Sequence, residues 1–103
     1  MRMMLKATIP VDTGNAAIKD GSLGKTMQAI LADLKPESAY FAVENGQRTA
    51  YLVFDMKDSS ELPAIGEPWF LAFEADIEAT PVMNLEDLTK AMPAIERAAK
   101  QYG

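Results

Sequence analysis

Residues 39–56 read AYFAVENGQRTAYLVFDM, and this stretch decides the fold. Asn45-Gly46 is the strongest short-range hairpin signal, because a type I′ turn needs a positive φ at both central residues. With a two-residue turn at that point, Tyr40 pairs with Tyr51 across the hairpin. The stretch therefore predicts two antiparallel strands, and their register fixes which side chains share each face.

The two faces of this hairpin differ in character. One face is apolar and typical of a core, and it carries Phe41, Val43, Ala50, Leu52, Phe54 and Met56. The other face mixes apolar and polar side chains, namely Tyr40, Ala42, Glu44, Gln47, Thr49, Tyr51, Val53 and Asp55. A half-apolar face of this kind predicts contact with a partner chain, or the wall of a ligand cavity.

The composition restricts the classes of function. The chain has 103 residues, 49% hydrophobic and 24% charged, which fits a single globular domain over residues 1–103. It contains neither histidine nor cysteine, so the commonest general base near neutral pH and the usual ligands of zinc and haem are missing. Only carboxylate metal sites stay open, and we expect neither a metal site nor a cofactor.

Charge and hydropathy bear on partners and location. The net charge is -5 and basic residues do not cluster, so we expect no nucleic-acid partner. No apolar run approaches the roughly 20 residues that a membrane span needs, so we expect no membrane partner. Lys6 lies where a signal peptide would continue its apolar core, and the absence of cysteine fits a reducing compartment. A cytoplasmic location is therefore expected.

Periodicity places the other elements around the hairpin. Alternation predicts strands over residues 1–10 and 75–83, and the second is an edge strand because Pro81 has no N–H to donate. Helical spacing predicts an earlier turn over 16–19, a helix over 23–34, short helical pieces over 60–66 and 68–73, and a last helix after Asn84, in which Pro93 introduces a kink or starts a second segment. We interpret the apolar stripes Leu23–Leu34 and Leu85–Tyr102 as core.

This order of elements predicts a fold. It is an α+β, ferredoxin-like β-α-β-β-α-β arrangement with an extra C-terminal helix, built on a four-stranded antiparallel sheet. Two helices can cover only one face of such a sheet. The opposite face would then expose Met4, Tyr40, Tyr51, Val53 and Val82 together, and this patch calls for an explanation.

With this element order and face composition, the chain resembles the dimeric α+β barrel superfamily. Its members include cofactor-free monooxygenases, muconolactone isomerases, haem-degrading enzymes and many uncharacterised bacterial proteins. The chain is also similar to uncharacterised bacterial proteins that share runs like Leu23-Gly24-Lys25-Thr26, Pro63-Ala64-Ile65 and Glu67-Pro68-Trp69-Phe70-Leu71. The resemblance implies a homodimer in which two sheets pack face to face. Haem-binding members use a histidine ligand, which this chain lacks.

Each candidate site has a chemical and a structural interpretation. The hydroxyls of Tyr40 and Tyr51 could orient a ligand, or the rings could form a cross-strand pair inside a dimer interface. Lys6 and Glu78, with Asp76, could do acid–base work, or could simply compensate each other's charge. Trp69 could roof a pocket between helix and sheet, as in superfamily enzymes, or belong to the core.

Three hypotheses follow from these candidates. The first is a homodimer that binds a small molecule in a cavity lined by Tyr40, Tyr51 and Trp69, with Lys6 as a further ligand-binding residue. The second is a cofactor-free monooxygenase or isomerase for a small aromatic or enolisable substrate, with Glu78 as base and Tyr51 orienting the substrate. The third is a purely structural or protein-docking dimer.

Overall fold

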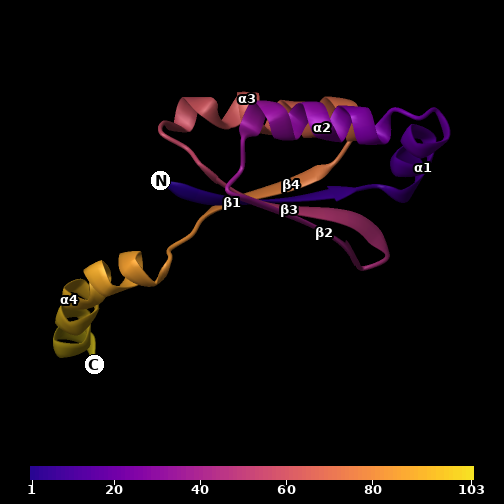
Figure 1. Cartoon of the computed structure of the whole chain (residues 1–103). Coiled ribbons are helices and arrows are strands. Elements are labelled where there is room, and N and C mark those ends of the chain that lie inside the picture. The colour runs from indigo at the N-terminus through magenta and orange to yellow at the C-terminus, as the bar shows by residue number, and fades with distance from the viewer.

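The computed structural model describes residues 1–103 and contains one sheet and four α-helices (Figure 1). The helices and strands are β1 (Arg2–Ile9), α1 (Val11–Lys19), α2 (Leu23–Leu34), β2 (Ser38–Glu44), β3 (Gln47–Asp55), a 3₁₀ turn (Ser59–Glu61), α3 (Leu62–Phe73), β4 (Asp76–Pro81) and α4 (Leu85–Tyr102). The predicted α+β, ferredoxin-like arrangement with an extra C-terminal helix is confirmed.

The sheet has the predicted topology and register. All its pairs are antiparallel and its strand order is β2-β3-β1-β4, which leaves β4 with Pro81 at an edge. Tyr40 pairs with Tyr51 in the hairpin, as predicted from the two-residue turn. Asn45 and Gly46 both have positive φ, 52° and 75°, so the turn that sets this register has the expected geometry.

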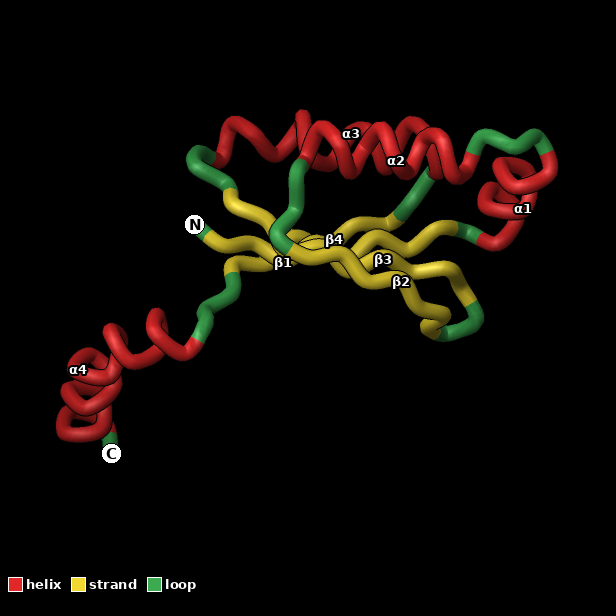
Figure 2. Tube along the Cα trace, in the orientation of Figure 1, coloured by secondary structure: helices red, strands yellow, loops and turns green.

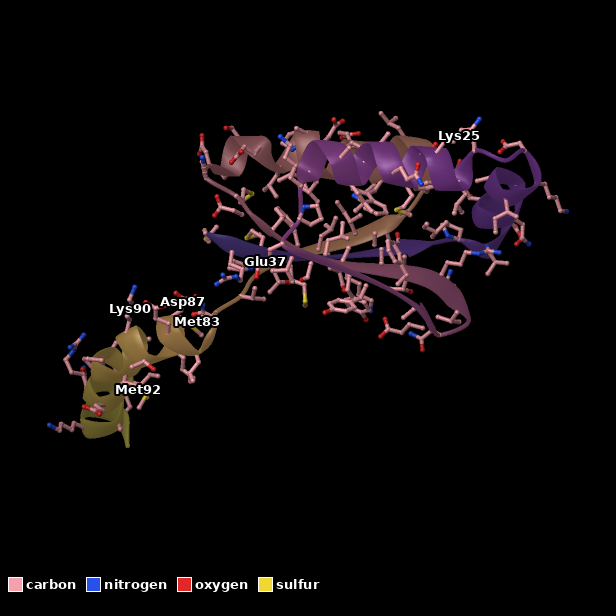
Figure 3. All side chains as sticks on the ribbon, viewed as in Figure 1. Lys25, Glu37, Met83, Asp87, Lys90 and Met92 are labelled. Atoms are coloured by element: carbon pink, nitrogen blue, oxygen red, sulfur yellow. The ribbon has the colours of Figure 1, made fainter.

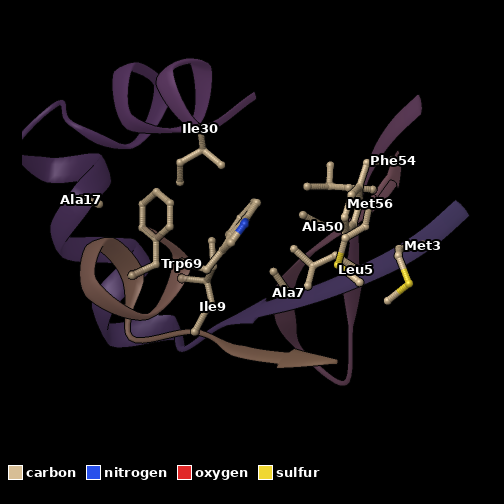
Figure 4. Close-up of a cluster of buried hydrophobic side chains, with 13 residues drawn as sticks. Met3, Leu5, Ala7, Ile9, Ala17, Ile30, Ala50, Phe54, Met56 and Trp69 are labelled. Carbon is tan, nitrogen blue, oxygen red and sulfur yellow. The ribbon is translucent and has the colours of Figure 1, made fainter. Parts of the chain in front are cut away.

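Helices α1, α2 and α3 lie on one face of the sheet and bury it (Figure 2). The core contains Met3, Leu5, Ala7, Ile9, Ala17, Ile30, Ala50, Leu52, Phe54, Met56, Trp69, Phe73 and Ala75. Figure 4 shows Trp69 between the sheet and α2, near Ile9 and Ile30. Phe41 and Val43 are on the same face of the sheet but are exposed, because they belong to the edge strand β2. The prediction that these two side chains are core is therefore wrong.

Two helical predictions change in the structure. The turn expected over 16–19 is a full helix, α1, which starts at Val11 directly after Pro10. The two pieces expected on either side of Gly66 are one helix, α3, with Pro68 inside it. Pro68 removes only the hydrogen bond to the carbonyl of Ala64, and that residue is exposed, so water can satisfy the carbonyl.

The largest departure concerns α4. Its apolar stripe, Leu85–Tyr102, was interpreted as core, and that prediction is wrong because α4 has no buried residue. The helix projects away from the rest of the fold (Figure 1), and its axis bends along the way, as expected for a helix containing Pro93. The core on the covered face of the sheet is closed by α1, α2 and α3, and α4 contributes no side chain to it.

No helix combines the length and the apolar character that crossing a membrane requires.

The core position of Leu5 gives a test of this packing. Leu5 is fully buried in β1, whereas Val43 in β2 is 77% exposed. We expect Leu5→Ala to lower the free energy of unfolding by about 2–5 kcal/mol, because it removes buried methyl groups and leaves a cavity. The matched surface variant Val43→Thr should change it by less than about 0.5 kcal/mol. Urea denaturation followed by circular dichroism measures both, and equal losses would contradict the assigned core.

Candidate functional site

The face of the sheet opposite the helices carries a row of site candidates across all four strands. The register aligns Tyr40 on β2, Tyr51 on β3, Lys6 on β1 and Glu78 on β4. Tyr40 is 70% exposed, while Tyr51 and Lys6 are half-buried by their neighbours. The structure therefore brings four of the five predicted site residues onto one face, and no helix of the chain covers it (Figure 1).

A hydrogen-bonded cluster joins Tyr51 and Lys6, in the middle of this row, to Glu44, which lies nearer the hairpin turn. The Tyr51 hydroxyl donates to Glu44 Oε1 at 2.7 Å, and Lys6 Nζ lies 2.5 Å from Glu44 Oε2. Lys6 Nζ also lies 4.0 Å from Glu78 Oε2. Lys6 therefore links two carboxylates, and Tyr51 holds the first of them from the neighbouring strand.

Sequence reasoning missed the role of Glu44, although a signal for it was present. Glu44 and Tyr51 share a face, but they belong to different cross-strand pairs, with one further pair of that face between them. The pair between them is Ala42 with Thr49, and both side chains are small. Small side chains leave space for the long Tyr51 ring to lie along the strand toward Glu44. A long side chain, two small ones and an acid on one face together predict this contact.

The cluster fixes the protonation state of its members. The hydrogen bond from Tyr51 to Glu44, aided by desolvation, raises the pKa of the phenol. The hydrogen bond to Glu44 raises the pKa of Lys6, while the bonds from Lys6 and then Tyr51 lower the pKa of Glu44. At neutral pH the cluster is therefore an ammonium group, a carboxylate and a neutral phenol.

A depression of about 400 Å³ lies beside the cluster. Its lining contains Lys6, Thr8, Glu44, Asn45, Gln47, Asp76, Ile77 and Glu78. Three carboxylates face one ammonium group there, so the depression has an excess of negative charge. Its field favours neutral or positively charged groups over anions.

Glu78, the predicted base, is far less constrained than Glu44. Its side chain is 74% exposed and its nearest charged partner is Lys6 at 4.0 Å. The hydroxyl of Tyr51, the predicted orienting residue, donates a hydrogen bond to Glu44 and not to Glu78. The structure therefore places both residues on the face as expected but does not join them in one hydrogen-bonded unit.

Trp69 lies on the other side of the sheet. It is fully buried in α3, with its ring centroid 6.1 Å from that of Phe73. Its indole Nε1 has no hydrogen-bond partner in the chain. The sheet separates Trp69 from Tyr40 and Tyr51, so a cavity lined by all three is not formed within one chain, and that part of the prediction is corrected. The core interpretation of Trp69 holds.

No group of three or more acidic side chains is arranged to hold a metal ion. The carboxylates around the depression come from different strands, and Lys6 lies between Glu44 and Glu78. Its ammonium group occupies the position in which a cation would bridge those two carboxylates.

Comparison with known proteins places the chain in a family. A model of a domain of unknown function, DUF3303, matches residues 1–96. This chain belongs to the DUF3303 family. The match runs from β1 into α4, so it includes the sheet, its covering helices and most of the projecting helix. No curated protein matches the chain.

Solved structures with a similar fold include a formyltetrahydrofolate deformylase from Pseudomonas putida KT2440, with a TM-score of 0.51 and 16% sequence identity. The alignment covers 80% of this chain but only 29% of that chain. The DUF3303 chain therefore resembles one part of a larger enzyme. At this identity the likeness concerns the fold alone.

The cluster predicts a shifted titration of Tyr51. We expect the phenol of Tyr51 to ionise at a higher pH in the wild type than in Glu44→Gln, because the substitution removes the carboxylate that holds its proton. Its contribution to the free energy of unfolding is present below the ordinary tyrosine pKa, and is lost as the pH rises through the raised value. The ¹³Cζ resonance of Tyr51, assigned with Tyr51→Phe, reports the titration. An unchanged Tyr51 pKa in Glu44→Gln would contradict the hydrogen bond.

Proposed function

We propose that this protein is a homodimer in which two sheets pack face to face and enclose a small-molecule site. The observation that carries the proposal is the uncovered face of the sheet. This face combines the exposed Tyr40 with the half-buried side chains of Met4, Tyr51 and Val53, and the chain supplies nothing to cover it. A contiguous apolar patch of this kind marks an interaction site.

A second copy of the same sheet fits this face. Stacked sheets pack about 10 Å apart, and the tyrosines and Met4 can interdigitate across that distance. The charged cluster is suited to burial, because Lys6 already bonds Glu44 and Tyr51 already donates to it. An ion pair whose members are hydrogen-bonded before burial avoids the cost of an unpaired buried charge.

The ligand site would be the depression beside Glu44. In the dimer, the partner's sheet would roof this depression and exclude water from it. The excess of carboxylates over the single ammonium of Lys6 favours a ligand that is positively charged, and the ring of Tyr51, whose hydroxyl bonds Glu44 of the lining, favours one with an apolar body. We therefore infer a small amine with an aromatic or aliphatic portion as the class of ligand.

A catalytic function has weaker support. A cofactor-free monooxygenase or isomerase needs a desolvated base near the substrate, and Glu78 is the predicted base on this face. Its side chain is largely in solvent, and the phenol of Tyr51 is engaged by Glu44. Binding without turnover is thus the function that the geometry supports best.

Charge placed on the uncovered face should break the dimer. Tyr40 and Val43 are both exposed on β2, at 70% and 77%, but they point to opposite faces of the sheet. We expect Tyr40→Glu to sediment as a monomer at micromolar concentration and Val43→Glu to remain a dimer. Both side chains are exposed in the single chain, so neither variant should unfold. Analytical ultracentrifugation measures the masses, and a dimeric Tyr40→Glu would contradict the proposed interface.

The charge of the depression predicts ligand preference. We expect phenethylamine to raise the melting temperature of the wild type, and phenylacetate, which has a similar shape and the opposite charge, to leave it unchanged. Glu78→Gln should reduce the effect of phenethylamine, since it removes one of the attracting carboxylates. Differential scanning fluorimetry measures these shifts. No effect of phenethylamine in a protein that is dimeric would favour the purely structural dimer instead.

A further inference from the structure

Helix α4 carries a regular apolar seam that nothing in its own chain covers. Its apolar side chains recur at alternating spacings of three and four, and they are Leu85, Leu88, Met92, Ile95, Ala99 and Tyr102. Leu85 and Tyr102 are 78% and 80% exposed. A stripe with this spacing is the pattern by which one helix packs on other helices. A solvated helix with such a seam has a partner elsewhere.

The root of α4 is held so that the helix points away from its own helical layer. The N–H of Val82 donates to the Arg2 carbonyl at 3.1 Å, and Arg2 Nη1 lies 3.7 Å from Asp87 Oδ2. Asn84 and Asp87 form a reciprocal capping box that fixes the first turn. Figure 3 shows Asp87 near Glu37 at this root, with Met92 farther out along the helix.

These contacts direct α4 to the uncovered side of the sheet. Figure 1 shows α1, α2 and α3 on one side of the sheet and α4 on the other. Only residues 82–84 join β4 to α4, and the contact of Val82 with β1 shortens the free part of that link. The helix therefore lies beyond the end of the sheet, beside the space in which the proposed second copy would lie.

The length of α4 matches the depth of a second copy. Its 18 residues make about 27 Å of helix, measured along its bent axis. A partner sheet would lie about 10 Å from the first sheet, and the partner's helical layer about 10–12 Å beyond it. The outer half of α4, with Ile95 and Ala99, would therefore come level with the partner's helices and not only with its sheet.

The helical layer offers a matching apolar groove between α2 and α3. The groove has a volume of about 720 Å³, and its apolar lining includes Ile30, Leu34, Ala64, Ile65, Pro68 and Leu71. Leu71 is 81% exposed, so the groove is unfilled in the single chain. Asp55, at the end of β3, also lines the groove. Its cross-strand partner is Arg2 of β1, and the next residue of β1, Met3, pairs with Pro81 at the end of β4. The groove thus opens at the end of the sheet from which α4 departs.

Charge permits this approach between two acidic copies. The helix α4 contains three acidic and three basic side chains, so the net charge of -5 lies entirely in the remainder of the chain. A neutral helix meets no net repulsion from the acidic body of another copy.

We propose that α4 of each chain docks its apolar seam into the α2–α3 groove of a second copy. The proposal rests on the face-to-face homodimer proposed above, and it makes the helix a reciprocal clamp that holds the two sheets together. The same contact made twice is what a two-fold symmetric dimer requires.

Cross-linking between differently marked chains tests this contact, because the chain has no native cysteine. A chain with Ala99→Cys on the seam is refolded with a mass-tagged chain that carries Ala64→Cys in the groove, and a short bismaleimide is added. We expect a cross-linked pair that contains one chain of each kind. The matched control is Gln101→Cys, which lies at nearly the same height on the opposite side of α4, and its yield should be several-fold lower.

The remaining outcomes separate the clamp from the dimer. Equal yields from Ala99→Cys and Gln101→Cys, or no cross-linked pair from a protein that is dimeric in solution, would overturn the clamp and leave the face-to-face dimer standing. The double variant Ala64→Cys/Ala99→Cys carries both cysteines in one chain. If it forms cross-links within single chains and no cross-linked pairs of chains, the clamp is overturned, because α4 then docks into the groove of its own chain. A monomeric wild type would overturn both proposals.

Discussion

The structure depends on one constraint, which is that the chain's own helices cover a single face of its sheet. Burial of Leu5, Leu52 and Phe54 under α2 and α3 fixes the order and register of the four strands. The same arrangement necessarily leaves the alternate side chains of each strand uncovered, because successive residues of a strand point to opposite faces. The proposed sheet-to-sheet interface and the proposed ligand site both concern that second face, which carries Tyr40, Tyr51 and Lys6.

The uncovered face is not an ordinary solvated surface. Such a face of an antiparallel sheet usually carries polar side chains in alternation with the core. Here the hydroxyl of Tyr51 donates a hydrogen bond to Glu44, and Lys6 forms ion pairs with Glu44 and Glu78. The polar groups of Tyr51, Lys6 and Glu44 are thus already paired with one another, which leaves the apolar parts of the face available for contact. This internal pairing is what makes burial against another copy energetically acceptable.

The sequence was sufficient for the parts of the structure that local rules decide. Asn45-Gly46 set the hairpin register, and Pro81 marked the edge strand, because both act through backbone geometry. It was insufficient where packing decides the outcome. An amphipathic stripe indicates that one face of α4 is suited to packing. It does not indicate whether that face packs within its own chain or against another chain. Trp69 was placed near the tyrosines because an aromatic residue in a sequence carries no information about which side of the sheet it lies on.

The cluster around Glu44 shows the same limit at the scale of a site. The face of each residue followed from the register, and the pairing of Lys6 with Glu78 across β1 and β4 was anticipated. The closer partner of Lys6, Glu44, was missed because it lies on β2, which β3 separates from β1. The hydrogen bond from Tyr51 to Glu44 was missed because it runs along the strands over Ala42 and Thr49 and not across them. Contacts of this kind depend on side-chain length and on vacant space, which alternation patterns do not record.

The most direct test of the central claim is the mass of the native protein in solution, measured by light scattering on a sizing column. Burial of the uncovered sheet face by a second copy predicts a mass of twice 11.2 kDa at micromolar concentration. A mass of one chain, unchanged as the concentration rises, would contradict it.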